Sequence, residues 1–257
     1  MKIAVWKNAV TYPAFKGLSD TFGSSVYQAT REQLTTDLQK GAAHVALIPT
    51  DVALANPNEF DILPAVAISS WNNPFAPLTV GSQLGNETLG LIHGVEGRLS
   101  ALIAAIVLKE HYGTMVALNE RNSLPEGIPS DALISIPLED QVDAPDDQAI
   151  TLDLGQEWYE MSNYPFVWAV FVTAKGAATD DTITAIRDAI VFIDDHRADF
   201  ARQWSQDPEV EDFVLNDLRF RLDDLAIASM TELCDQLYYY GITEEIQPVQ
   251  LASLTEK

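Results

Sequence analysis

The chain has 257 residues, of which 47% are hydrophobic and 21% are charged, so it can bury a sizeable core and is not globally disordered. Its 38 acidic and 15 basic residues give a formal net charge of -23, which disfavours binding to nucleic acid and to anionic membranes. The same charge would also repel a small anion unless the site reverses the sign locally.

The N-terminal part alternates short apolar runs with helical patterns. Strands are predicted at Ile3–Trp6, Ser25–Ala29, Val45–Pro49 and Ala65–Ser70. Thr30 followed by Gln33 is a capping-box pattern, which predicts a helix that ends at Gly41. A helix or turn near Pro13 and a brief helix over Asp51–Ala55 complete the series. This order predicts a parallel sheet with helices on its faces.

A second α/β segment follows. Thr88–Ile92, Val116–Leu118 and Ala132–Ile136 are predicted strands. The segment Arg98–His111 is apolar nearly all round, which predicts a buried helix.

The last part of the chain is helical. Apolar residues from Ile183 to Trp204 step by three and four, Pro208 begins a short helix, and a final helix carries Leu222 to Tyr240. We therefore predict an α/β fold in which residues 1–80 form the first part of lobe one and residues 81–170 form an inserted lobe two. Residues 171–257 then return to lobe one with C-terminal helices.

Three further features of the sequence bear on the cellular compartment of the protein. Cys234 is the single cysteine, which excludes an intramolecular disulfide and a multi-cysteine metal site and fits a reduced cytosol. Met1–Asn8 is interpreted as a first strand and not as a signal peptide. The longest apolar run, Ser100–Leu108, is too short to span a bilayer. We expect a cytoplasmic protein.

The most distinctive stretch is Asp153–Phe171, which combines a Gly turn, an acidic pair, two Trp residues and an apolar run. It resembles the signature D-L-G-x-E-W…P-F-V-x-A-V of the family that contains the chorismate dehydratases of the futalosine route to menaquinone. The matching residues are Asp153, Leu154, Gly155, Glu157, Trp158, Pro165, Phe166, Val167, Ala169 and Val170.

Two further segments are similar to the same family. Val45–Ser70 contains V-A-L-I and then L-P followed by I-S-S, and Leu218–Leu222 precedes a helix that ends in Tyr-Gly-Ile. Together the three segments cover most of the chain in the expected order. The resemblance implies a two-lobed, type II periplasmic-binding-protein-like fold with mixed sheets flanked by helices. It also implies a carboxylate-bearing small molecule in the cleft of a cytosolic enzyme.

The first loop departs from the family pattern. Alignment on Pro13 places Val10 where the family has an Asn in the site. Asn8 lies two residues earlier and Thr11 one residue later, and both are polar groups just after the first strand, a usual ligand position. Asn8 and Thr11 are therefore candidate catalytic residues.

The turn His93–Arg98 stands where the family has an S-x-T-S turn. His93 is the third catalytic candidate, because histidine exchanges protons near neutral pH, and the alternative is a loop histidine without that role. Arg98 would bind a carboxylate, against a plain surface role in the first helical turn. Gly94 and Gly97 would let the backbone approach a ligand, or serve only as turn glycines.

The end of the fourth strand supplies further substrate-binding candidates. Ser69 and Ser70 would donate hydrogen bonds to a carboxylate or simply cap the strand end. Asn72 lies in Trp71–Pro77, which is bulkier and stiffer than the Gly- and Ser-rich ligand loop of the family.

The signature stretch itself contributes one candidate. Tyr164 would cover a ligand ring, whereas Phe166 and Trp168 are interpreted as core aromatics. Glu157 and Glu160 are interpreted as acids on a helix surface and not as a catalytic pair.

The leading interpretation is a chorismate dehydratase-like lyase. By resemblance, it would eliminate water from chorismate to give 3-[(1-carboxyvinyl)oxy]benzoate in menaquinone biosynthesis. The alternative is a non-catalytic binding protein for a small anionic or aromatic acid on the same scaffold. No cofactor, no metal, no nucleic acid and no membrane partner are expected, and a homodimer stays open.

Overall fold

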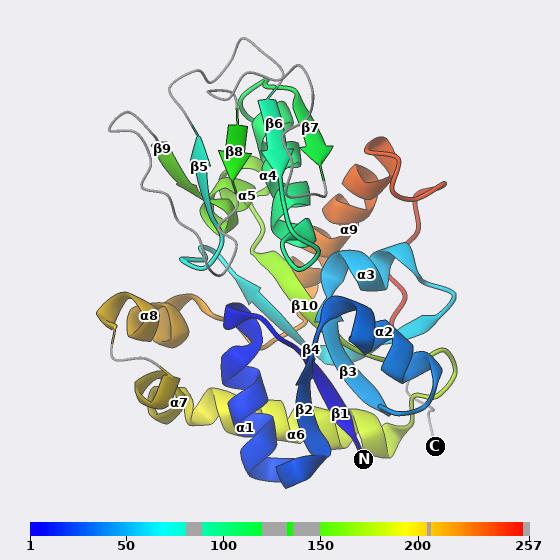
Figure 1. Cartoon of the computed structure of the whole chain (residues 1–257). Coiled ribbons are helices and arrows are strands. Elements are labelled where there is room, and N and C mark those ends of the chain that lie inside the picture. Colours follow the sequence, from blue (N-terminus) through cyan, green and yellow to red (C-terminus); the bar gives the residue numbers. More distant parts are fainter. Residues whose placement is uncertain (81–88, 120–132, 136–149, 205–206, 254–257) are drawn as a thin grey trace. The chain divides into compact units, whose positions relative to one another are not determined.

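A computed structural model describes residues 1–80, 89–119, 133–135, 150–204 and 207–253. The chain divides into two compact units, of which unit 1 is Met1–Ser70 with Tyr164–Lys257 and unit 2 is Trp71–Asn163. Each unit is built on a five-stranded mixed sheet with helices against it, so the predicted α/β class is confirmed (Figure 1).

The sheet of unit 1 has the strand order β2-β1-β3-β10-β4. Its strands are β1 (Ile3–Trp6), β2 (Val26–Ala29), β3 (Val45–Pro49), β4 (Phe60–Ser70) and β10 (Phe166–Ala174). β1 pairs in parallel with β2 and β3, whereas β10 runs antiparallel to both β3 and β4. β4 therefore points the same way as β1, β2 and β3, and these four strands end at one edge of the sheet.

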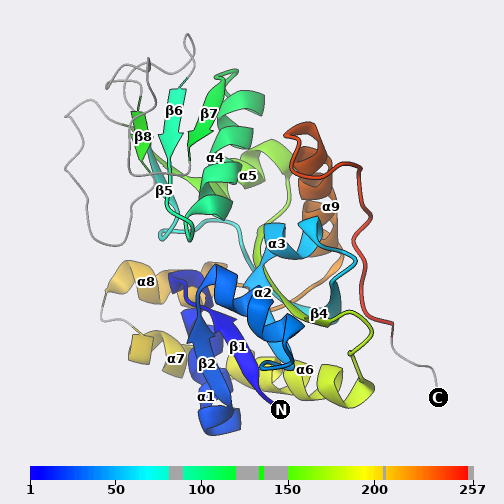
Figure 2. The same cartoon turned by 45° about the vertical axis from the view of Figure 1, so that its right-hand side comes forward.

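Helices cover both faces of this sheet. The helices of unit 1 are α1 (Tyr12–Phe22), α2 (Arg31–Gln39), α3 (Thr50–Ala55), α6 (Asp180–Asp195), α7 (Arg197–Trp204), α8 (Pro208–Asp212) and α9 (Asp224–Tyr239). Short turns of helix occur at η1 (Ala9–Thr11), η2 (Gly23–Ser25) and η4 (Phe213–Asp217). α1 packs with α6 and α7 on one face, and α2, α3 and α9 lie on the other (Figures 1 and 2). Because both faces are covered, β10 is buried from Phe166 to Thr173.

Local hydrogen bonds set the ends of these helices. Thr30 and Gln33 form the predicted capping box of α2, and Gly41 follows the helix with a φ of 68°. The predicted run to Trp204 is interrupted at His196, where the backbone N–H bonds back to carbonyls of α6. Leu222 was predicted within the last helix, but Asp223 is the N-cap of α9, so Leu222 precedes it.

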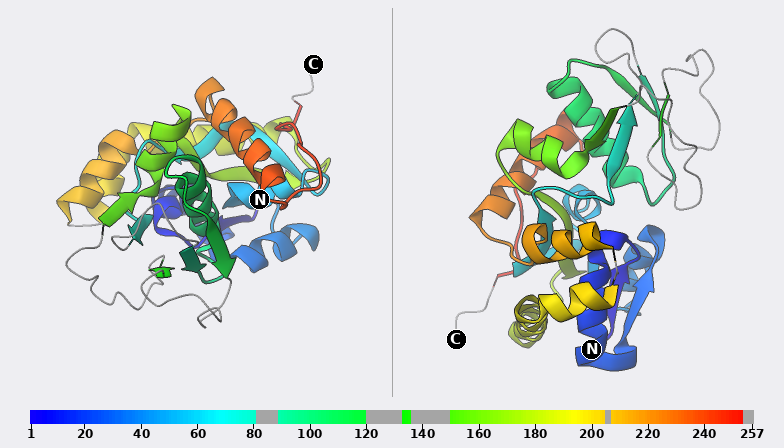
Figure 3. Two further views of the ribbon diagram at one scale, coloured as in Figure 1. Left: turned by 90° about the horizontal axis from the view of Figure 1, so that it is seen from above. Right: turned by 90° about the vertical axis from the view of Figure 1, so that its left-hand side faces the viewer.

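The sheet of unit 2 has the strand order β7-β6-β8-β5-β9. Its strands are β5 (Pro77–Val80), β6 (Leu89–Ile92), β7 (Val116–Asn119), β8 (Leu133–Ser135) and β9 (Ile150–Asp153). α4 (Arg98–Glu110) and α5 (Leu154–Ser162) contact each other on one face of this sheet (Figures 2 and 3). α4 is buried from Ala101 to Leu108, as its apolar sequence predicts, and His111 caps its C-terminus.

Among the helices within the described ranges, none is both long enough and apolar enough to cross a membrane.

Candidate functional site

The carboxyl edge of the unit 1 sheet gathers polar side chains from four segments. They follow β1 at Asn8 and Thr11, β2 at Arg31 and β3 at Thr50 and Asp51, and they end β4 at Ser69 and Ser70. In open α/β sheets, ligands bind at this edge. We therefore take it as the candidate site of unit 1.

The two polar residues after β1 are engaged with their own loop. The Asn8 side chain accepts a hydrogen bond from the Val10 backbone N–H at 3.0 Å, which makes Asn8 the N-cap of η1. Thr11 is fully buried, and its hydroxyl lies 2.5 Å from the carbonyl oxygen of Trp6 and 3.0 Å from that of Asn8. These bonds fix the loop and leave the Thr11 hydroxyl little capacity to donate to a ligand.

Ser69 and Ser70 are both fully buried but differ in their hydrogen bonding. The Ser70 hydroxyl oxygen accepts a bond from the Trp168 indole N–H at 2.8 Å. The Ser69 hydroxyl has no hydrogen-bond partner among the described residues, although its backbone pairs with Arg219. A buried hydroxyl without a partner is unusual and is explained when a bound molecule or water supplies one.

Three residues at the same edge were not selected from the sequence. Asp51 forms an ion pair with Arg31, and both side chains are largely buried. The Oδ1 oxygen of Asp51 and the hydroxyl of Thr50 are buried without a hydrogen bond from the described part of the chain. The sequence could have indicated Thr50 and Asp51 by their position directly after a predicted buried strand. The ion pair with Arg31 could not be predicted, because it joins segments that are distant in sequence.

In unit 2, the turn before α4 and the first residue of that helix include four predicted site residues. His93 is 5% exposed, and its Nδ1 lies 2.9 Å from the carbonyl oxygen of Gly94. Because a carbonyl oxygen can only accept, a hydrogen bond here requires the tautomer with the proton on Nδ1, which leaves Nε2 as an acceptor. Gly97 is the N-cap of α4 and its N–H bonds the Gly94 carbonyl. Arg98 is exposed, and no acidic side chain in the described ranges pairs with it.

The other site residues predicted from the sequence lie in different units. Asn72 belongs to unit 2, where its backbone lies against Gly155, and the partly exposed Tyr164 begins the second stretch of unit 1. Phe166 and Trp168 are core aromatics as predicted, with ring centroids 4.7 Å apart.

The acidic pair in α5 only partly matches its interpretation as surface acids. Glu160 is exposed, but Glu157 is 7% exposed and accepts a hydrogen bond from the Tyr112 hydroxyl at 2.8 Å. The prediction is therefore wrong for Glu157. The reason is that α5 packs on α4 in unit 2, a contact that no local pattern specifies.

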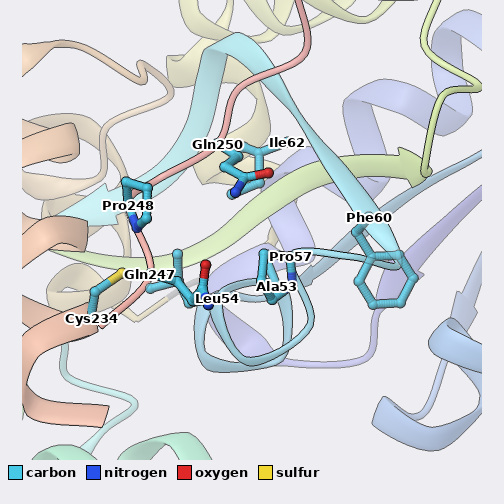
Figure 4. A pocket seen from close by; sticks show the side chains of 9 residues that line it. All are labelled: Ala53, Leu54, Pro57, Phe60, Ile62, Cys234, Gln247, Pro248 and Gln250. Atoms are coloured by element: carbon cyan, nitrogen blue, oxygen red, sulfur yellow. The ribbon is translucent and has the colours of Figure 1, made fainter. Parts of the chain in front are cut away.

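A separate pocket in unit 1 lies between α3, β4, α9 and the segment that follows α9 (Figure 4). Its walls include Leu54, Phe60, Ile62, Cys234, Gln247 and Gln250. None of the residues that line it is charged, so it does not suit a molecule with two carboxylates.

Solved structures with a similar fold are numerous. Protein AF1704 from Archaeoglobus fulgidus has a TM-score of 0.60 at 13% identity, with 94% of this chain and 97% of that chain covered. The Candida albicans CA3427 gene product, described as exhibiting the generic periplasmic binding protein fold, has a TM-score of 0.56 at 16% identity, with 100% and 99% covered. The aliphatic sulphonate binding protein SsuA from Escherichia coli has a TM-score of 0.59 at 11% identity, with 100% and 95% covered.

These likenesses confirm the predicted periplasmic-binding-protein-like fold and, at such identities, show the fold alone. No curated protein sequence matches the chain. The sequence model described as menaquinone biosynthesis matches residues 1–239, which confirms the resemblance and supports a role in that pathway. The chain therefore belongs to the menaquinone biosynthesis family.

Proposed function

We propose that this protein is a chorismate dehydratase-like lyase of menaquinone biosynthesis. The observation that carries the proposal is the buried hydroxyl of Ser69 at the carboxyl edge of the unit 1 sheet, which has no hydrogen-bond partner among the described residues, in a member of this family. A buried hydroxyl of this kind is suited to bind a carboxylate of the substrate. It has already lost its hydrogen bond to water on folding, so a hydrogen bond to the substrate is a net gain.

The reaction is an elimination that needs no oxidant and no reductant. Chorismate loses its ring hydroxyl together with one ring proton, and the two leave as water while the ring becomes aromatic in 3-[(1-carboxyvinyl)oxy]benzoate. The protein must hold two carboxylates and accept or relay one proton. Within this proposal, the Ser69 hydroxyl of unit 1 binds a carboxylate. In unit 2, Arg98 is proposed on its own account as a cation for a carboxylate, and Nε2 of His93 as an acceptor for the proton.

A non-catalytic binding protein for a small aromatic or anionic acid is the second candidate. It is favoured by the loop after β1, where Val10 is buried and the polar groups of Asn8 and Thr11 are already hydrogen-bonded within the loop. A loop that satisfies its own polar groups still shapes a site but contributes less to a reaction.

Incubation of the purified chain with chorismate separates the two candidates. The enzyme converts chorismate to a product lighter by one water, identified by chromatography and mass spectrometry against authentic 3-[(1-carboxyvinyl)oxy]benzoate. The binding protein gives saturable calorimetric binding with chorismate recovered intact. The proposal fails if the folded protein shows neither turnover of chorismate nor saturable binding of it.

Arg98→Gln and Arg187→Gln form a matched pair for this assay. Both remove one exposed positive charge from a helix, but Arg187 lies on α6 and is paired with Asp188. We expect kcat/KM for chorismate to fall for Arg98→Gln and to stay near the wild-type value for Arg187→Gln. Equal effects would assign the change to overall charge and not to a carboxylate contact.

A further inference from the structure

Unit 2 carries a cluster of one imidazole and two carboxylates. His111, Glu157 and Glu160 each offer one donor atom, and these atoms all lie within 4.8 Å of one another. We propose that the three residues bind a divalent metal ion of the zinc class. The site is separate from the elimination chemistry described above and would be a function of unit 2 itself.

The fold brings the three side chains together from two helices. His111 is the C-cap of α4, and Glu157 and Glu160 are three residues apart on α5, so they share one face of that helix. α4 and α5 contact each other on the same side of the unit 2 sheet (Figure 3). His111 is distant from Glu157 in the sequence, which is why no metal motif could be recognised there.

Both carboxylates are oriented by a neighbour. The Tyr112 hydroxyl donates to Oε2 of Glu157 at 2.8 Å, and the Gln156 amide donates to Oε1 of Glu160 at 2.8 Å. Within the described ranges, each glutamate therefore has one oxygen held by a protein donor and one oxygen left for a cation. Such outer hydrogen bonds are a usual feature of metal sites, because they orient the ligands.

The electrostatics of Glu157 favour a cation. Its side chain is 7% exposed, and the Tyr112 bond is the only hydrogen bond that it receives from the described ranges. Burial raises the pKa of Glu157, and the nearby charge of Glu160 acts in the same direction. The Tyr112 bond and His111 oppose this shift, yet the net change is upward. A bound metal ion would stabilise the charged carboxylate that burial disfavours.

The donor set selects the kind of ion. One imidazole nitrogen with two carboxylate oxygens suits Zn²⁺ and similar transition metals, with a water as the fourth ligand. Ca²⁺ and Mg²⁺ prefer sites made wholly of oxygen ligands. The donor atoms all lie within 4.8 Å of one another, and His111 and Glu160 are exposed, so their side chains can adjust around an ion.

Binding would join the C-terminus of α4 to α5. α5 carries the Asp-Leu-Gly-x-Glu-Trp part of the signature, and its Trp158 is fully buried in unit 2. A metal ion at this place would therefore stabilise unit 2 against unfolding, and the stabilisation would grow with the logarithm of the metal concentration relative to its dissociation constant.

The test uses the whole chain, stripped with a chelator and titrated with Zn²⁺ by calorimetry. We expect saturation at a single Zn²⁺ per chain and a rise in Tm. His111→Gln and Glu160→Gln should each weaken binding by more than the roughly tenfold loss expected for Tyr112→Phe, which removes only an orienting hydroxyl. Circular dichroism of each variant checks that the fold is kept.

Glu110→Gln is the matched control for Glu160→Gln. Glu110 is an exposed acid beside His111 that pairs with Lys109, so the two variants make the same charge change in the same region. The Zn²⁺ affinity of Glu110→Gln should stay within about twofold of the wild-type value. Such a change is much smaller than the roughly tenfold loss expected when an orienting residue is removed. The proposal is overturned if Zn²⁺ does not bind saturably or if His111→Gln leaves binding unchanged. It is also overturned if Glu110→Gln loses as much affinity as Glu160→Gln, because that result would show diffuse attraction of the cation to an acidic chain.

Discussion

The carboxylate of Asp153 fastens the loop after β4 to the start of α5 by accepting hydrogen bonds from the backbone of Asn73. Both of its oxygens lie 2.8 Å from the Asn73 N–H. Oδ1 also accepts from Gly155 at 2.8 Å and from Gln156 at 3.0 Å, as an N-cap does. One side chain thus caps a helix and fixes a loop that is remote in sequence.

Asp153→Ala should lower the free energy of unfolding by about 2–4 kcal/mol. The figure combines a lost N-cap with a part-buried backbone N–H that loses its partner. Urea denaturation measures it. Thr179→Ala removes an N-cap that serves its own helix, so a loss of only about 1 kcal/mol is expected there. A loss for Asp153→Ala no greater than that for Thr179→Ala would show that the Asn73 bond contributes nothing.

Gly155→Ala should also destabilise the protein, for a steric reason. A Cβ at Gly155 would lie 2.7 Å from the carbonyl carbon of Asn72 and 2.9 Å from its Cα, and backbone atoms cannot move aside cheaply. We expect a loss of about 1–3 kcal/mol, as for overpacking of a filled interior. Gln156→Ala, at the next and exposed position of α5, should change stability by less than about 0.5 kcal/mol. Equal stability of the two variants would contradict the close approach.

These two residues explain what the signature could predict. The Asp-Leu-Gly pattern indicates a helix start and identifies the family, because the cap and the missing Cβ are needed wherever this loop meets this helix. Patterns that act within one element were equally informative, such as the Thr30–Gln33 capping box and the apolar helix after Arg98. Such features depend only on neighbours in the chain.

Features that depend on distant partners were not predictable. β9 has half-exposed residues and becomes a strand because it pairs with β5 through Pro77↔Asp153 to Val80↔Ile150. Leu222 has helical spacing but is drawn into a bridge with Ala65. In the candidate site, the sequence indicated Ser69 and Ser70 but not which hydroxyl is free. That distinction depends on the position of Trp168 on the neighbouring strand.

Ser69→Ala and Ser70→Ala form a matched pair that tests this distinction. Ser70→Ala leaves the buried Trp168 N–H without its acceptor and should cost about 1–3 kcal/mol of stability. Ser69→Ala removes a hydroxyl that has no hydrogen-bond partner in the described part of the chain, so stability should change by less than about 0.5 kcal/mol. Under the proposed function, Ser69→Ala lowers kcat/KM for chorismate while the fold stays intact. Similar stability losses in both variants would mean that Ser69 also has a structural partner.

Cys234 should resist alkylation in the folded protein. The residue is 5% exposed, and burial, helped by the charge of Asp235, raises the pKa of Cys234 to about 11. At pH 8, roughly one thiol in a thousand would be the reactive thiolate. Mass spectrometry after iodoacetamide treatment should show slow labelling in buffer and rapid labelling in urea. Rapid labelling of the native chain would contradict the buried position beside the pocket of Figure 4.

Tyr27 should make stability decrease at alkaline pH. Its hydroxyl donates to Asp37 at 2.7 Å, and burial, together with that bond and the charge of Asp37, raises the pKa of Tyr27 from 10.0 to about 12. Between these values the folded state holds the proton more tightly than the unfolded state, so the contribution is complete below pH 10 and is lost as pH rises towards 12.

Tyr27→Phe should therefore show a shallower decrease in the free energy of unfolding between pH 10 and 12 than the wild type does. The decrease should not vanish, because the pKa of Tyr112 is also raised to about 12 by burial and by its bond to Glu157. Tyr239→Phe, which changes a tyrosine that is 69% exposed, should keep the wild-type slope. Urea midpoints measured across this range give the slopes, and identical slopes for Tyr27→Phe and wild type would falsify the role assigned to the Tyr27–Asp37 bond.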